Sequence, residues 1–416
     1  MDNNVQKKNN KNSRNNKIQI NQSSNIKKKV SALTNKVPKN IMIIILFVLV
    51  FLFLILMIFF SAPYRTNRTI KTLETYQRYQ TIKNFDFVNK GETILGNQQI
   101  ASSYNSCNVR KPYFAYINCK DILYGILKSG ARYIEVKIFN DKFGTKNTNP
   151  IINNGFETGE WKLCFNSKTF EEFCKVVKEN AFSISKKIGR KNTSGVPNSE
   201  DPLFISLDLK TRNNIYTLNN VAKLIMKYFG PKLLEKKYRH YAGNLLNIKM
   251  NALKGRVVIF ASGGHDGSQL TELINGCWED GGNITRYYIK DIEIMDAEER
   301  ETLKGKTKQK LTIVTPDTVL DNVIELNLFK KQNYDTKPLF NLGIHFICVY
   351  YQSLDNYIDY YITKFKNYAI ITKPRELQMQ YDNKSNQVDT KKERYTYSKY
   401  KNKLQEVKDY LEKIKE

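Results

Sequence analysis

The 416-residue sequence has few of the residues that most often hold metals or transfer protons. It contains three histidines, and its six cysteines, at positions 107, 119, 164, 174, 277 and 348, include no CxxC pair. The missing spacing excludes the common structural zinc sites. No glycine-rich phosphate loop follows the first predicted strand and no nucleic-acid-binding motif is visible, which argues against a dinucleotide-binding sheet and against a nucleic-acid partner.

Acidic residues are scarce beside basic ones, with 40 Asp and Glu against 67 Lys and Arg and a net charge of +27. This charge favours acidic partners such as anionic lipid headgroups or phosphate ligands, although a general abundance of Lys, Asn and Ile explains part of it equally well. Residues 1–40 hold ten Lys and Arg and one Asp. We predict that they form a disordered basic arm, suited to an anionic lipid surface.

The chain has one long hydrophobic run, the twenty uncharged residues 41–60, which read IMIIILFVLVFLFLILMIFF. A helix of about twenty residues spans the roughly 30 Å hydrocarbon core of a bilayer, so we predict a single transmembrane helix. A cleaved signal peptide would have a shorter apolar core nearer the N-terminus. The basic arm favours a cytoplasmic N-terminus and a lumenal or external remainder, where the cysteines could form disulfides of undetermined pairing.

Beyond a polar stretch at 61–90, which we interpret as a stalk, apolar strands alternate with helices. The strands are predicted at 131–139, 202–209, 255–262, 343–351 and 368–373, and the helices at 169–182, 214–230 and 354–365. This pattern predicts an α/β fold, and residues 91–375 suit a TIM-type (β/α)8 barrel whose site lies at the C-terminal ends of its strands. A doubly wound sheet is the alternative. The polar tail, 376–416, ends in an amphipathic helix suited to a protein partner.

Five short segments resemble, in the same order along the chain, the phosphoinositide-specific phospholipase C family, above all its X half. They read SYNS at 103–106, GARYIEVKIFND at 130–141, PIINNGF at 150–156, TFEEFCKVVKENAF at 169–182 and PLFISLDL at 202–209. A fainter likeness to the Y half of the family covers 342–374. The resemblance extends over about two thirds of the chain and implies a barrel of the PLC-like phosphodiesterase kind.

The resemblance also implies roles for single residues. Two family histidines transfer protons, and Tyr104 and Asn154 stand at their positions. A phenol with a pKa of about 10 is a poor base at neutral pH, and an amide does not titrate. Asn105, Glu135 and Asp208 match three of the four calcium ligands of the animal enzymes.

Lys137 stands at the fourth calcium position, where its ammonium would repel the ion. We expect Lys137 to take the place of the ion, to pair with Glu135 and Asp208, and to offer positive charge to a phosphate together with Arg132. The alternative is that Lys137 points outwards.

Another histidine could replace the missing pair. His265, in the segment ASGGHDGS at 261–268, follows a predicted strand and would lie beside Asp266 on a loop at the site. We treat it as a candidate acid or base. A plain glycine-rich turn is the alternative.

We therefore predict a membrane-anchored, catalytically degenerate phospholipase-C-like barrel that binds a phosphoinositide, another anionic phosphate ligand or a protein partner. One alternative is an active phosphoric diester hydrolase with non-standard catalytic residues. Another is a structural or receptor-binding membrane protein, since a fold does not imply a function. No cofactor is expected, apart from calcium if the site is active.

Overall fold

The computed structural model describes residues 38–109, 116–142, 148–155, 161–184, 187–188, 191–192, 195–241, 244–279, 281–317 and 333–379. The chain forms two compact units that divide after Tyr64. The predicted basic arm, except for its last residues, and the predicted tail helix lie outside the described residues.

In the first unit, the apolar run forms one helix, α2 (Lys39–Phe60). Its stretch Asn40–Met57 has a mean hydropathy of 3.3, and none of that stretch is buried. Within the described part of the chain, it is the one helix that is long and apolar enough to cross a membrane. A signal sequence would meet the same two criteria.

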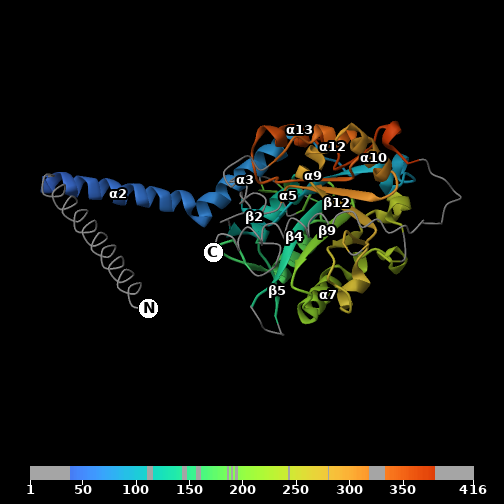
Figure 1. Cartoon of the computed structure of the whole chain (residues 1–416), viewed down its shortest axis with the longest axis horizontal. Helices are drawn as coiled ribbons and strands as arrows, with labels where there is room; N and C mark the ends of the chain where they lie inside the picture. The colour runs from blue at the N-terminus through green and yellow to red at the C-terminus, as the bar shows by residue number, and fades with distance from the viewer. Residues whose placement is uncertain are drawn as a thin grey trace, which may run out of the picture. The chain divides into compact units, whose positions relative to one another are not determined.

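The second unit is built on eight parallel strands that form a nearly closed barrel (Figure 1). They are β1 (Gln98–Ser103), β4 (Tyr133–Asn140), β9 (Leu203–Lys210), β10 (Val257–Ala261), β11 (Gly276–Cys277), β12 (Ile284–Tyr288), β13 (Leu311–Thr315) and β14 (Phe346–Val349). Their order in the barrel is their order along the chain, and β14 returns to pair with β1. This closure confirms the predicted barrel, because the first and last strands of a doubly wound sheet do not pair.

The junction between β11 and β12 is made by a side chain. No backbone ladder joins these two strands in the described chain. Instead, the Cys277 N–H donates to Asn283 Oδ1 at 3.0 Å, and Asn283 Nδ2 donates to the Asn275 carbonyl at 3.0 Å. The Asn283 amide therefore satisfies backbone groups that a strand partner would otherwise bind.

Aromatic rings fill the lower part of the barrel. The Phe346 ring centre lies 5.1 Å from that of Tyr133, 5.1 Å from that of Phe204 and 5.5 Å from that of Phe260. All four side chains come from inward-facing positions of different strands, as in the layered cores of (β/α)8 barrels. The interior is thus packed, and room for a ligand is restricted to the ends of the strands.

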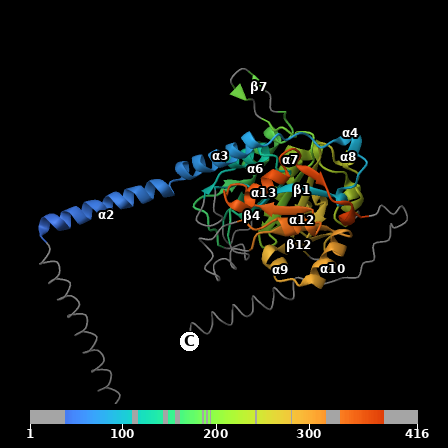
Figure 2. The same ribbon diagram turned by 90° about the horizontal axis from the view of Figure 1, so that it is seen from above.

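Helices cover the outside of the strands in both views (Figure 1, Figure 2). The predicted helices at 169–182 and 214–230 are α6 (Phe170–Asn180) and α7 (Ile215–Phe229). Each begins at a capping side chain, since Thr169 accepts from the Glu172 N–H and Asn214 accepts from the Thr217 N–H. Their apolar faces pack against the outward residues of β4, β9 and β10 in one buried cluster.

Helix α3 (Ala62–Tyr79) covers most of the stretch that the sequence suggests is a stalk. From Arg65 onwards it belongs to the barrel unit. Leu73 and Tyr76 are buried in a second cluster outside the barrel, and Gln77 Nε2 donates to the Gly125 carbonyl at 3.2 Å. This part of α3 is therefore packed against the barrel and is not a free stalk.

Two short strands extend the sheet at its edges. β15 (Ile370–Thr372), predicted within 368–373, pairs with β1 in the antiparallel sense. β5 (Pro150–Ile152) runs antiparallel to the end of β4, with Ile152 opposite Ile138. The second pairing brings the segment after β5 to the C-terminal end of the barrel.

Candidate functional site

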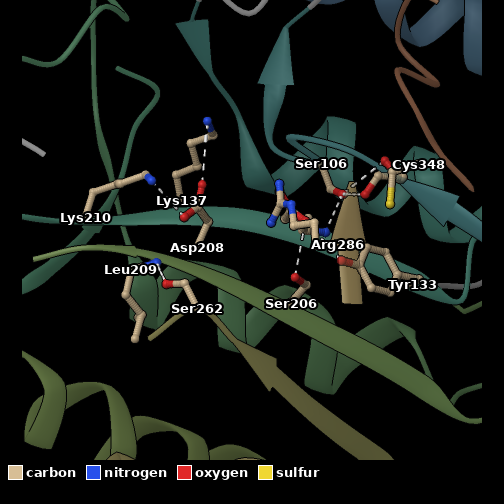
Figure 3. A network of polar contacts seen from close by, with 12 residues as sticks. Ser106, Tyr133, Lys137, Ser206, Asp208, Leu209, Lys210, Ser262, Arg286 and Cys348 are labelled. Atoms are coloured by element: carbon tan, nitrogen blue, oxygen red, sulfur yellow. Dashed lines mark hydrogen bonds and ion pairs between the residues drawn. The ribbon is translucent and has the colours of Figure 1, made fainter. Parts of the chain in front are cut away.

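Inward-facing residues change from aromatic to charged towards the C-terminal ends of β4 and β9 (Figure 3). Alternation along a strand places Tyr133, Glu135 and Lys137 on the same face of β4. In the ladder, Glu135 lies opposite Ser206 and Lys137 lies opposite Asp208. The barrel mouth therefore carries charged groups directly above its aromatic core.

Asp208 is held by two lysines, and dashed lines join both of them to its carboxylate in Figure 3. Lys210 Nζ lies 3.0 Å from Asp208 Oδ1, and Lys137 Nζ lies 3.6 Å from Asp208 Oδ2. Burial alone would raise the pKa of Asp208, but Lys210 and then Lys137 hold it well below its ordinary value. Lys137 thus points inwards, as expected, and Asp208 is ionised at neutral pH.

Glu135 lies deeper and is fully buried. Its Oε1 accepts from Arg286 Nη2 at 3.0 Å, and its Oε2 accepts from the hydroxyls of Tyr133 at 3.0 Å and Ser206 at 3.2 Å. Burial alone would lower the pKa of Arg286, but Glu135 holds it well above its ordinary value. Glu135 is thus paired with Arg286, and the expected pairing of Lys137 is found with Asp208.

Arg286, on β12, is a site residue that the sequence reasoning missed. Its guanidinium lies among aromatic rings, 4.8 Å from the centre of Trp278 and 5.9 Å from those of Tyr104 and Tyr288. Its Nε and Nη1 are buried and have no hydrogen-bond partner in the described structure. A charged group with unused donors is a strong feature of a binding site for an anion.

Tyr104 and Asn105 follow β1 directly and reach the same mouth. Both are buried, and Lys137 Nζ lies 5.6 Å from the centre of the Tyr104 ring. The Asn105 backbone has a φ of 46°, in the left-handed region, and its carbonyl accepts from Gln352 Nε2 at 3.2 Å. The Ser106 N–H then donates to the Glu135 carbonyl at 2.8 Å, which fixes the segment against β4.

Asn154 is buried next to β4. The Asn153 N–H donates to the Lys137 carbonyl at 3.4 Å, and Asn153 Oδ1 accepts from the N–H groups of Asn154 at 2.7 Å and Cys164 at 3.2 Å. The structure therefore brings Asn154 to the neighbourhood of Lys137. Its amide offers hydrogen bonds there but no titratable proton.

Arg132 does not join this cluster. It precedes β4, at the opposite end from the mouth, and it is fully buried. Its Nη1 donates to the Ala181 carbonyl at 2.9 Å, and its Nη2 donates to Asn198 Oδ1 at 2.7 Å. Burial lowers the pKa of Arg132 to about 10, while Asp201 opposes this shift. These contacts favour a structural role for Arg132 over the ligand-binding role expected from the sequence.

His265 lies on the loop after β10, as expected, but it is buried among other partners. Its Nδ1 lies 3.2 Å from Thr271 Oγ1 and 3.8 Å from Asp266 Oδ1, and its ring packs edge-on against His240 at 5.3 Å. Asp266 itself is mostly exposed. None of these partners belongs to the cluster around Glu135 and Asp208.

The residues at the calcium positions do not fit calcium. The Glu135 and Asp208 carboxylates, two of the three matching side chains, are already bound to cations of the protein. No group of three or more His, Cys, Asp or Glu suited to a metal occurs among the described residues. A divalent ion would have to approach Lys137, Lys210 and Arg286 closely, and the repulsion is strong in a buried site. We therefore derive no chemical step through calcium.

Two more mouth residues escaped the sequence reasoning. Lys210 continues β9 by two residues beyond Asp208, and Glu279 follows β11 and accepts from the Gly263 N–H at 3.2 Å. Burial and the neighbouring Asp208 raise the pKa of Glu279, and the charge of Lys210 reduces this rise. The period-two pattern of β9 could have revealed Lys210, whereas no local signal indicates Glu279 or Arg286.

Comparisons with known proteins agree with this geometry. Residues 92–262 match the family model for the phosphatidylinositol-specific phospholipase C X domain. No curated protein sequence matches the chain.

Two solved structures are similar in fold. PLC21 of S. officinalis has a TM-score of 0.55 and 15% identity, with 69% of this chain and 38% of that chain covered. PLC21 of L. pealei has a TM-score of 0.54 and 15% identity, with the same coverage of 69% and 38%. The chain thus matches well under half of these larger proteins, and at this identity the likeness shows the fold alone. Residues 92–262 thus carry a phosphatidylinositol-specific phospholipase C X domain.

Proposed function

We propose that this phospholipase-C-like barrel binds the phosphate of an anionic lipid headgroup, such as a phosphoinositide, without cleaving it, and that α2 anchors it to a membrane. One observation carries the proposal. Cations of the protein are bound to the carboxylates that match calcium positions, with Lys137 and Lys210 on Asp208 and Arg286 on Glu135.

The donors left over at the mouth suit a phosphate. Arg286 Nε and Nη1 are buried and without a protein partner in the described structure. A guanidinium fork binds two oxygens of a phosphate at once, and the surrounding rings of Trp278 and Tyr104 keep water away from it. Gln352 Oε1 and Thr315 Oγ1, near the ends of β14 and β13, are also buried without a partner and could bind hydroxyl groups of a polyol headgroup.

The same site is poorly equipped for cleavage. Transfer of the alcohol proton to and from a phosphodiester needs groups that titrate near neutral pH. Tyr104 and Asn154 stand where the family has histidines, and neither supplies such a group. His265 is the candidate for an active hydrolase, but its contacts are with Thr271 and His240, and neither residue belongs to the cluster around Asp208.

Helix α2 supports the membrane part of the proposal. A barrel joined to a membrane-spanning helix would meet lipid headgroups, either of the bilayer that holds the helix or of a bilayer facing it. Because the local concentration of lipid is then high, modest affinity would be enough for binding. The orientation proposed here has the basic arm in the cytoplasm and the barrel on the lumenal or external side.

The test uses the full-length protein in detergent micelles that contain phosphatidylinositol bisphosphate, charge-matched phosphatidylserine, or neither. We expect the phosphoinositide to raise the thermal midpoint most, and we expect no release of water-soluble inositol phosphate with calcium or with a chelator. Arg286→Gln should abolish the shift, and Arg256→Gln, at the opposite end of the barrel, should retain it.

Three results would overturn the proposal. Equal shifts with both lipids would reduce the interaction to surface charge. No shift with any lipid in the wild-type protein would favour a structural or receptor-binding role. Turnover that His265→Ala abolishes would establish an active hydrolase.

A further inference from the structure

Two buried cysteines lie side by side behind the segment that carries Tyr104 and Asn105. Cys107 and Cys119 are 1% and 0% exposed and belong to the same buried cluster, in which Cys119 is a neighbour of the Cys107 side chain. All six cysteines are thiols in the structure. None of the roles assigned to the barrel mouth uses this pair.

The backbone holds the two cysteines in place from both sides. β2 (Asn108–Val109) and β3 (Tyr116–Ile117) form an antiparallel pair in which Asn108 lies opposite Ile117. One residue further along this pair, the Asn118 N–H donates to the Cys107 carbonyl at 2.8 Å. Cys119 follows at once and begins the helical turn η2 (Cys119–Leu123), whose start is capped by the Asn118 side chain.

We propose that Cys107 and Cys119 are a disulfide site, which closes covalently when the chain folds in an oxidising compartment. The reaction is thiol–disulfide exchange with a small disulfide such as oxidised glutathione. One cysteine thiolate attacks the small disulfide and releases one thiol, and the second cysteine then displaces the other thiol. Two protein thiols and one small disulfide become one protein disulfide and two small thiols.

The bond would stabilise a strained part of the barrel mouth. Asn105, with its left-handed backbone, lies two residues before Cys107. Ser106, between them, donates to the Ser103 Oγ at 3.0 Å and accepts from the Glu135 N–H at 3.2 Å. A Cys107–Cys119 link closes a short loop in the unfolded chain and so favours the folded arrangement of β2, β3 and η2, against which the Asn105 segment is held.

The timing of the bond follows from burial. Burial, and then Cys119, raise the pKa of the Cys107 thiol well above its ordinary value. The attacking species is the thiolate, so exchange in the folded protein is slow and the bond forms mainly while the chain is folding. A competitor is Cys174 on α6, a buried thiol in the same cluster as Cys107 and Cys119.

The test maps the thiols of the full-length protein, expressed through a secretory pathway and purified in detergent. Free thiols are blocked with a maleimide in denaturant, so that buried thiols also react, before proteolysis without reductant. We expect a linked peptide pair containing Cys107 and Cys119, lighter by two hydrogen atoms than the sum of the two peptides and separated by reductant. Reduction should lower the thermal midpoint by about 5 °C.

Variants assign the bond. Cys174→Ser should keep the linked peptides and Cys107→Ser should abolish them, together with the effect of reductant on the thermal midpoint. Maleimide labelling of both Cys107 and Cys119 in the wild-type protein, or a Cys119–Cys174 link, would overturn the proposal. The wild-type map decides alone if a variant fails to fold, and the inference does not rest on the proposed lipid binding.

Discussion

Lys137 and Asp208 form an ion pair inside the barrel mouth, with Lys137 Nζ 3.6 Å from Asp208 Oδ2. They are register partners on neighbouring parallel strands, so the pairing follows from the β4–β9 ladder itself. Lys210 binds the other oxygen of the same carboxylate at 3.0 Å. The Asp208 carboxylate is therefore bound by two ammonium groups at once.

The first prediction concerns calcium. Because Lys137 pairs with Asp208 at the place where the family resemblance implies a calcium ligand, the thermal midpoint of the wild-type protein should be the same with calcium and with a chelator. Lys137→Asp replaces the ammonium by a third carboxylate beside Glu135 and Asp208, and its thermal midpoint should rise with calcium. Lys249→Asp, at an exposed ion pair with Glu92, is the matched control and should not respond. A calcium-dependent midpoint in the wild-type protein would contradict the assignment.

The second prediction concerns the Glu135–Arg286 pair. Arg286→Met leaves the fully buried Glu135 without its cation and should reduce the free energy of unfolding by about 3–5 kcal/mol. Glu135→Gln added to Arg286→Met should recover a large part of this loss, because no buried charge is then left unpaired. Denaturant titration of the four proteins of this cycle measures the coupling.

The exposed Lys237–Glu235 pair gives the control for that cycle. Lys237→Met should leave the midpoint of the denaturant titration unchanged, since solvent screens exposed pairs. Equal losses for Arg286→Met and for the double variant would show that packing, and not the ion pair, dominates at Arg286.

Sequence patterns predicted the long, regular parts of the fold. The strand at 202–209 is a short, mostly apolar run that is buried on both faces, and the helix at 214–230 buries one apolar face and begins at the Asn214 cap. β12 and β13 were missed. β12 reads ITRYY, and its inward positions after Ile284 carry Arg286 and Tyr288, so it lacks the apolar run typical of a buried strand.

The sequence indicated those site residues that lie within the segments resembling the phospholipase C family. Tyr104, Asn105, Glu135, Lys137 and Asp208 come from three neighbouring strands, and the structure brings them together at one mouth. Arg286 reaches the same mouth from a strand more than a hundred residues later in the sequence. Such a contact forms only when the barrel closes, so no local sequence pattern predicts it. Arg132 failed to join because it lies at the other end of β4, three residues below Glu135.

The third prediction is a pH dependence from a buried lysine at the other end of the barrel. Lys373 Nζ lies 2.8 Å from His345 Nε2, and His345 Nδ1 accepts from the Thr312 N–H at 3.1 Å. Burial, and then the nearby Lys308, lower the pKa of Lys373 to about 7 from 10.5. Between these two pKa values the unfolded chain binds more protons than the folded one, so stability rises with pH across that window.

The measurement is the free energy of unfolding from about pH 7 to about pH 10. The wild-type protein should gain stability relative to Lys373→Met by up to roughly 4 kcal/mol over this range. Lys366→Met, at an exposed position, should follow the wild-type curve. Parallel curves for the wild-type protein and Lys373→Met would show that Lys373 is charged in the folded state.

The fourth prediction separates the structural role of Arg132 from a ligand-binding one. Arg132→Met removes the donors to Ala181 and Asn198 and the cation near the buried Asp201, and it should destabilise the protein by about 3–5 kcal/mol. At a temperature where the variant is still folded, its response to phosphoinositide micelles should match that of the wild-type protein. A weakened response to phosphoinositide with unchanged stability would show that Arg132 takes part in ligand binding.

The last prediction restores the missing acid and base. If the site binds a phosphodiester but lacks proton transfer, Tyr104→His combined with Asn154→His should release inositol phosphate from phosphatidylinositol at least about 100-fold above the wild-type background. Each single variant should stay near background, because a phosphodiester cleavage needs a proton both removed and supplied. Built-in cations at Lys137 and Arg286 would stabilise the developing charge in place of a metal. A wild-type rate equal to that of the double variant would show that the barrel already possesses a working acid and base.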